Sequence, residues 1–170
     1  MEIPRHVEKK VRDAFGAVIN EDWDGVAEAL RGLEPEEGAV ALSLAVYVCG
    51  YVVDDIYVVH AKSGDGIPSR AELRDLASGI VNVLAERGAG VIGDDEEVAV
   101  FLGLAGEAFR GDTEPGPDPL RGLDPKSAVY LAFMCGGYLL AVYRRDEQGE
   151  HWWEYLDRIW AHALADDTSP

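Results

Sequence analysis

The residues that could do chemistry in this 170-residue sequence do not form a recognised catalytic or metal-binding motif. Its four histidines, His6, His60, His151 and His162, lack the HExxH and ExxH spacings of zinc hydrolases and carboxylate-bridged di-iron proteins. The sequence also has no GxSxG, Walker A or CxxC motif. A catalytic triad can assemble from distant residues, so this absence is only weak evidence against an enzyme. We therefore assign no catalytic residue, metal ligand or cofactor, and favour a non-enzymatic role.

One stretch, Gly88 to Gly93, matches the GxGxxG string of dinucleotide-binding folds. In those folds the glycines lie between a strand and a helix whose N-terminus binds a pyrophosphate. Here a helical pattern precedes the glycines, and four carboxylates follow at residues 94–97, where the phosphates would lie. The stretch therefore favours a loop between helices over a nucleotide site.

Polar residues at the end of an apolar run offer a second type of site. Asp54 and Asp55 follow sixteen residues without a charge, and Tyr51 and Tyr138 occupy similar positions in two related segments. These four residues are the candidates for a small-ligand or enzyme pocket between the two halves of the chain. The alternative is that this helix simply emerges into solvent at Asp54.

The charge balance restricts the choice of partner. There are 32 acidic and 15 basic residues, so the net charge is −17 and the pI is about 4.4. Such a surface repels phosphate, which argues against nucleic acid and anionic membranes and favours a basic protein partner. Solubility and adaptation to high salt are alternative causes of the same acidity.

Much of the acidity lies in two segments. Residues 21–37 hold seven acidic residues against one arginine, and residues 94–118 hold eight against one. We expect these segments to form two acidic faces that bind a partner, through Glu21, Asp22, Asp24, Glu28, Asp94, Asp95, Glu96 and Glu97. The alternative is that they are ordinary acidic helix starts and solvated faces.

The last amphipathic segment, residues 150–165, adds a further candidate surface. His151, Tyr155, Arg158 and His162 recur at i, i+4, i+7 and i+11, beside Trp153 and Trp160. Aromatic and arginine side chains on one exposed face are typical of interface anchors. The alternative is that the tryptophans pack on the body of the protein and the histidines merely border them.

The elements that must position these residues are all predicted to be helices. Apolar residues recur at helical spacing within residues 5–19, 22–31, 35–60, 69–87, 94–110, 125–145 and 150–165. Capping residues such as Ser69 and Asp94, and Pro35 after Glu34, mark several starts. The sequence predicts a single all-α domain, a helical bundle of about six or seven helices around two apolar central helices at about 35–60 and 125–145. A proline-rich connection is expected at 111–120.

A repeat relates the two halves. The segment Arg31-Gly32-Leu33-Glu34-Pro35 resembles Arg121-Gly122-Leu123-Asp124-Pro125, which lies 90 residues later. The segment Cys49-Gly50-Tyr51 likewise resembles Cys135-Gly136-Gly137-Tyr138. We predict two pseudo-repeats, at about 5–88 and 94–166, whose central helices cross at these glycines. Cys49 and Cys135 are expected to behave as small buried hydrophobic residues.

These observations lead to one principal functional hypothesis. The N-terminal residues lack the apolar stretch of a signal peptide, and the apolar runs are shorter than the roughly 20 residues of a bilayer span, so we expect a cytoplasmic protein. We predict an acidic interaction module of the inhibitor or immunity type, which occludes a basic site on another protein. A homodimer joined through the last helix is a further hypothesis.

Overall fold

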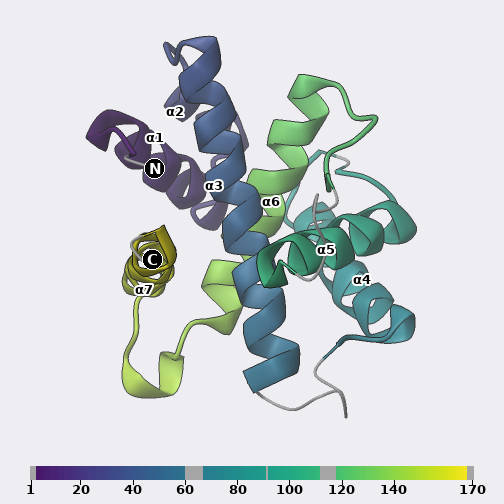
Figure 1. Ribbon diagram of the computed structural model, residues 1–170. Helices are drawn as coiled ribbons and strands as arrows, with labels where there is room; N and C mark the ends of the chain where they lie inside the picture. Colours follow the sequence, from purple (N-terminus) through teal and green to yellow (C-terminus); the bar gives the residue numbers. More distant parts are fainter. Residues whose placement is uncertain (1–2, 60–66, 91, 112–117, 168–170) are drawn as a thin grey trace.

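The computed structural model describes residues 3–59, 67–90, 92–111 and 118–167, and within these ranges the chain forms seven α-helices and no strand (Figure 1). The helices are α1 (Arg5–Ile19), α2 (Trp23–Leu30), α3 (Pro35–Asp54), α4 (Arg70–Glu86), α5 (Asp95–Arg110), α6 (Pro125–Tyr143) and α7 (Trp152–Asp167). A π-helical turn, Asp55–Val59, extends α3, and a 3₁₀ turn, Asp146–Gln148, precedes α7. The predicted all-α bundle is confirmed. His60 and most of the expected connection at 111–120 lie outside the described residues.

Local capping explains why several helices start where the sequence predicted. The Ser69 hydroxyl accepts a hydrogen bond from the Glu72 amide, and the Glu72 carboxylate accepts one from the Ser69 amide, both at 3.1 Å. Asp94 accepts the Glu97 amide at 2.8 Å at the start of α5. Each bond satisfies an amide that the first helical turn leaves without a partner.

The two apolar helices α3 and α6 cross near the centre of the molecule (Figure 1). They meet at the cysteines: the Cys49 thiol donates a hydrogen bond to the Ala132 carbonyl, with an Sγ to O distance of 3.5 Å. Both cysteines are unpaired and fully buried, which confirms the prediction for these residues. Burial raises the pKa of the Cys135 thiol to about 12, so it stays protonated at neutral pH.

The predicted crossing of the central helices at their glycines is wrong. A Cβ atom on Gly50 would collide with the backbone of Ala105 in α5 and not with α6. On Gly137 a Cβ would stand 2.6 Å from a methyl group of Val18 in α1, and on Gly136 it would meet the Phe15 ring. The glycines therefore accept the outer helices α5 and α1, and not the opposite central helix.

The two outer contacts correspond to each other along the sequence. Helix α5 packs on α3 at Gly50 through Ala105, and α1 packs on α6 at Gly137 through Val18. Gly137 lies 87 residues after Gly50, and Val18 lies 87 residues before Ala105. Gly32 and Gly122, before α3 and α6, also share a left-handed φ of 85°. These contacts agree with a repeat, and the duplication itself stays a prediction.

Two segments, Pro35–Tyr57 and Pro125–Tyr143, have the length and apolar composition of a membrane span. Their most apolar windows are 50% and 56% buried inside the protein. Central helices of a bundle meet the same criteria because they are apolar on all sides.

Candidate protein-interaction site

The predicted exposed face on the last helix is wrong for Tyr155. This side chain is fully buried, and its hydroxyl donates a hydrogen bond to Asp55 Oδ2 at 3.0 Å. Asp55 begins the π-helical turn after α3, so the bond ties α7 to the end of the central helix. Tyr155 cannot contact a partner while α7 is in place.

Arg158 is also engaged within the protein. Its guanidinium donates two hydrogen bonds to Glu150, at 2.9 and 3.0 Å, and lies 4.5 Å from the centre of the Tyr155 ring. A planar guanidinium suits this combination of a two-point carboxylate contact and a stacked ring. Arg158 therefore fixes the start of α7 and covers the buried tyrosine.

The two histidines of the predicted face have different surroundings. His162 Nδ1 shares a hydrogen bond of 2.9 Å with the Tyr47 hydroxyl, and its ring lies 5.4 Å from that of Tyr51. His151 is exposed and stacks on Trp153, with ring centres 4.3 Å apart and an angle of 8° between the planes. Within the predicted face, His151 is therefore the residue that lies beside the exposed Trp153.

The candidate ligand residues do not converge on one pocket. Tyr51 packs against Phe109 and His162, while Asp55 accepts the Tyr155 hydroxyl. Tyr138 lies beside α4 instead, with its hydroxyl 3.9 Å from the position of a Cβ on Gly79. Asp54 also interacts with another residue of the protein. The structure thus joins Tyr51 and Asp55 to Tyr155 and His162 in a cluster that braces α7, and Tyr138 lies apart from this cluster, beside α4.

Buried tyrosines make the stability of the fold sensitive to alkaline pH. Burial, followed by nearby Tyr143, raises the pKa of Tyr57 from 10.0 to about 12, and burial also raises the pKa values of Tyr143 and Tyr155. Above about pH 10 the unfolded chain loses protons that the folded protein keeps, so the free energy of unfolding must fall as the pH rises through this range. We expect urea unfolding to show this loss between about pH 10 and pH 12, and Tyr57→Phe to reduce it. An equal slope in the variant would contradict the assignment.

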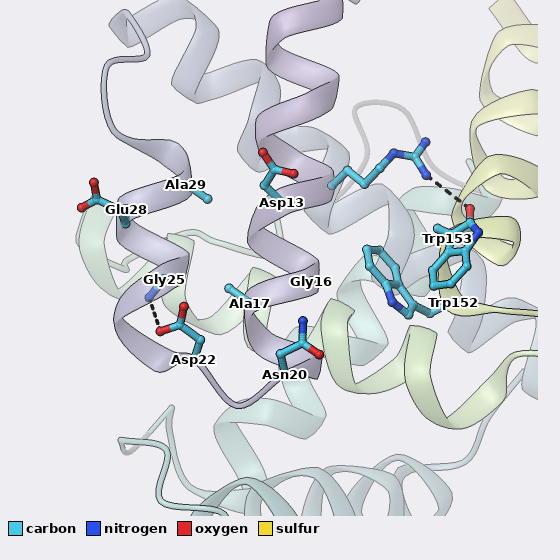
Figure 2. Close-up of a pocket in the computed structure, with 11 residues that line it drawn as sticks. Asp13, Gly16, Ala17, Asn20, Asp22, Gly25, Glu28, Ala29, Trp152 and Trp153 are labelled. Carbon is cyan, nitrogen blue, oxygen red and sulfur yellow. Dashed lines mark hydrogen bonds between the residues drawn. The ribbon is translucent and has the colours of Figure 1, made fainter.

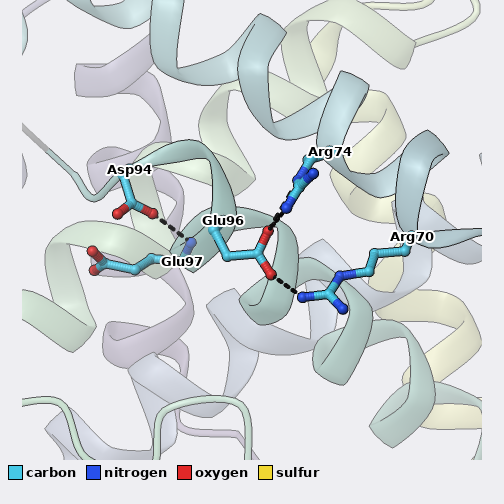
Figure 3. Close-up of polar contacts among 5 residues, drawn as sticks. All are labelled: Arg70, Arg74, Asp94, Glu96 and Glu97. Atoms are coloured by element: carbon cyan, nitrogen blue, oxygen red, sulfur yellow. Dashed lines mark hydrogen bonds and ion pairs between the residues drawn. The ribbon is translucent and has the colours of Figure 1, made fainter.

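Two of the acidic residues at the start of α5 have contacts within the protein: Glu96 joins this helix to α4, and Asp94 caps it (Figure 3). Glu96 bridges two arginines of α4, with ion-pair distances of 2.5 Å to Arg70 and 2.6 Å to Arg74. These hydrogen bonds lower the pKa of Glu96. Asp94 caps the helix, while Asp95 and Glu97 occupy its first turn. Glu96 and Asp94 therefore have structural roles, and their predicted role in binding stays a prediction.

The acidic residues around α2 lie at a different surface. Asp22 caps α2 by accepting the Gly25 amide at 3.1 Å, and Glu21 lies 3.5 Å from Arg87. Glu28 pairs with Arg31 at 2.9 Å, and Asp24 is exposed in the first turn. Asp22 and Glu28 also line a groove that involves three helices.

This groove runs over the exposed face of α1, between α2 on one side and the start of α7 on the other (Figure 2). Its volume is about 650 Å³. We call it the acid-tryptophan groove, and it is lined by Arg12, Asp13, Gly16, Ala17, Asn20, Asp22, Gly25, Glu28, Ala29, Trp152 and Trp153. Small side chains form its floor, and two tryptophans form one wall.

Arg12 positions the tryptophan wall. Its guanidinium donates hydrogen bonds to Asp157 Oδ1 at 2.6 Å and to the Trp153 carbonyl at 3.4 Å. Trp152 packs on α1 at Gly16, where a Cβ would stand 3.4 Å from the indole ring. Trp153 remains 42% exposed, which is unusual for so large an apolar side chain.

The groove is acidic. Three carboxylates line it, those of Asp13, Asp22 and Glu28, against the single guanidinium of Arg12. That guanidinium is already paired with Asp157, and two of the carboxylates are paired as well, Asp13 with Lys9 at 2.6 Å and Glu28 with Arg31 at 2.9 Å. With these partners included, four carboxylates stand against three cations in and beside the groove. A cationic side chain entering the groove therefore meets a net negative surface.

Sequence reasoning found two of the groove carboxylates and noted Trp153, but missed the groove itself. The available signal was the spacing of Asp13, Gly16, Ala17 and Asn20, which places small and polar residues on one face of α1. Comparison with protein-family models, curated proteins and solved structures found no match to this chain.

Proposed function

We propose that this protein is an acidic, cytoplasmic interaction module of the inhibitor or immunity type, which binds a basic site of a partner protein in the acid-tryptophan groove. The observation that carries the proposal is the combination, in one groove, of a 42% exposed Trp153 with three carboxylates, two of them paired with Lys9 and Arg31, and one guanidinium that is paired with Asp157. Most other groups predicted to bind a partner are engaged within the fold.

The two kinds of side chain support different aspects of binding. Tryptophan is enriched among the residues that dominate binding energy, because it buries a large area with little loss of conformational freedom. Carboxylates at the edge of an interface mainly increase the association rate and select a basic partner. The net charge of −17 extends the same attraction over a longer range.

The test is capture of the partner from a lysate of the native host at low salt, followed by binding measurements with the purified partner. We expect Trp153→Ala to weaken binding by roughly 30-fold or more, the effect of losing a major interface side chain. Asp13→Asn with Glu28→Gln should mainly slow association and make it less sensitive to salt between about 0.05 and 0.5 M.

The matched control is Glu86→Gln with Glu147→Gln, which removes the same charge from two exposed positions outside the groove. If this control slows association as much as the groove variant does, net charge and not the groove is responsible. A partner whose affinity is equal at low and high salt would contradict the proposal. Self-association in sizing chromatography, lost in Trp153→Ala, would identify a second copy of the chain as the occupant instead.

A further inference from the structure

We infer that this protein forms a homodimer in which the α5 face of one copy binds the α5 face of a second copy. The α5 face is the groove between α4 and α5, and its apolar lining residues are Ile67, Pro68, Leu73, Ala99, Val100 and Leu104. Helices α4 and α5 lie on the right of Figure 1, whereas α1, α2 and α7, which line the acid-tryptophan groove, lie on the left. The inference is independent of the proposed function, because the two grooves share no lining residue.

Exposed apolar side chains border the α5 face. Ile67 is 53% exposed and Val100 is 50% exposed. They are two of the six large apolar side chains that are exposed in the part of the chain the structure describes. Contact with another apolar surface removes such side chains from water, which favours association. The α5 face therefore has a driving force for binding a second apolar surface.

The charge of the α5 face is balanced, although the chain carries a net charge of −17. The groove is lined by two arginines and two carboxylates, Arg70, Arg110, Glu96 and Glu107. Asp94 and Glu97, at the start of the same helix, line a neighbouring groove instead. Two copies with a large charge of the same sign repel each other, so a second copy approaches closely only where this charge is locally neutralised. The balance of charge therefore suits a second copy better than a strongly basic or acidic partner.

The apolar residues along α5 are arranged so that the face can bind a copy of itself. A two-fold axis near Leu102, perpendicular to α5, makes the two α5 helices antiparallel. It places Val100 of each copy opposite Leu104 of the other, because each of these residues lies two positions from Leu102. Each copy then supplies one exposed valine and receives another, as an isologous contact requires.

The same axis brings opposite charges together. Glu107 of one copy lies opposite the start of α5 in the other, where Arg70 and Arg74 of α4 both reach Glu96 (Figure 3). Two cations therefore accompany one carboxylate at this position, and the Arg70 side chain is 80% exposed. Within the described ranges Glu107 forms no ion pair. Arginine has five N–H donors, so Arg70 can bind Glu107 of the second copy while it keeps its bond to Glu96.

The test is sedimentation velocity of the full chain over a range of concentrations at about 0.15 M salt. We expect a dimer whose dissociation constant rises roughly 30-fold or more in Val100→Asp, because a carboxylate then lies in the apolar centre of the contact. The matched control is Val142→Asp, which adds the same charge on α6 at a valine that is also 50% exposed. It should change the dissociation constant by less than about twofold. Equal weakening by the two aspartates, or a monomer at every concentration, would overturn the inference.

Charge reversal tests the antiparallel arrangement. Arg70→Glu and Glu107→Arg should each weaken the dimer by roughly 10-fold, because like charges then lie opposite each other at two symmetric positions. The double variant restores opposite charges, so its dissociation constant should return to within about threefold of the original value. Weakening by both single variants without recovery in the double variant would overturn the inferred two-fold contact.

Dimer formation and partner binding are tested separately. Val100→Asp should leave binding of the partner in the acid-tryptophan groove unchanged, and Trp153→Ala should leave the dimer intact. A dimer that Trp153→Ala abolishes and Val100→Asp preserves would lie at the last helix, the position hypothesised from the sequence, and would overturn the inference. Loss of partner binding in Trp153→Ala with an intact dimer would instead support both proposals.

Discussion

Gly50→Leu is expected to leave this protein largely unfolded. Even the first side-chain atom, a Cβ, would overlap the carbonyl oxygen of Ala105 and stand 2.8 Å from the Cβ of Phe109. The obstacle is helix backbone, which cannot rotate away as a side chain can, so α5 has to move off α3. Overpacking a core with a few extra carbons typically costs about 1–3 kcal/mol and more where nothing yields. Leucine at this position should exhaust most of the roughly 5–15 kcal/mol that stabilises a domain of this kind.

The measurement is urea unfolding followed by circular dichroism, with Gly50→Ala as the milder variant and Gly38→Ala as its matched control. Gly38 lies in the same helix, and nothing lies within 4 Å of its Cβ position. Alanine there should stabilise the protein by about 0.5–1 kcal/mol, because glycine loses more conformational freedom on entering a helix. Equal free energies of unfolding for the two alanine variants would contradict the close approach of α5 at Gly50.

Tyr155→Ala is expected to destabilise the protein by about 3–5 kcal/mol, the usual cost of removing a buried aromatic side chain. The ring is fully buried, and Arg158 lies over it. The variant also removes the hydroxyl that donates to Asp55, so α7 loses its bond to the end of the central helix. Urea unfolding measures the loss, and tryptophan fluorescence reports on the change around Trp152 and Trp153.

Tyr155→Phe separates the ring from the hydroxyl. It keeps the packing and removes only the hydrogen bond, so we expect a cost of about 1–3 kcal/mol, since a carboxylate then loses its donor. If alanine and phenylalanine destabilise the protein equally, the ring contributes nothing and the assignment of Tyr155 to the core is wrong.

The same variants separate structural from functional effects at α7. Tyr155→Ala should also impair partner binding, because α7 carries the tryptophan wall of the groove. Trp153→Ala should impair binding with little loss of stability, since Trp153 is substantially exposed. A binding defect without destabilisation is therefore the signature of the groove itself.

Local signals in the sequence explain why the helices were predicted well. The start of α4 depends on Ser69 and Glu72, three residues apart, and that of α5 on Asp94 and Glu97. Capping and helical periodicity act within a few residues, so they can be recognised without knowledge of the fold. Burial of Cys49 and Cys135 was equally accessible, because each lies in a long uncharged run.

The partners of each helix could not be predicted in the same way. Gly50 and Gly137 were recognised as sites of close approach, but they accept α5 and α1 and not each other. A glycine in a helix indicates that another element comes near, and it contains no information about which one. Tyr155 was placed on an exposed face because its helical stripe includes histidines and an arginine, and a stripe does not specify which side faces the protein.

The sequence by itself determined the helical class, the helix boundaries, the acidity and the burial of the apolar runs, since these depend on residues close along the chain. Only the tertiary structure decided that Asp22 and Glu28 share a groove with Trp152 and Trp153, residues more than 120 positions away. It also decided that Glu96 lies between Arg70 and Arg74 of α4, whereas Asp22 and Glu28 line an open groove. The physical reason is that charge and exposure at a surface depend on which helices pack together. That packing results from many weak contacts between residues far apart in the sequence, which no local sequence pattern specifies.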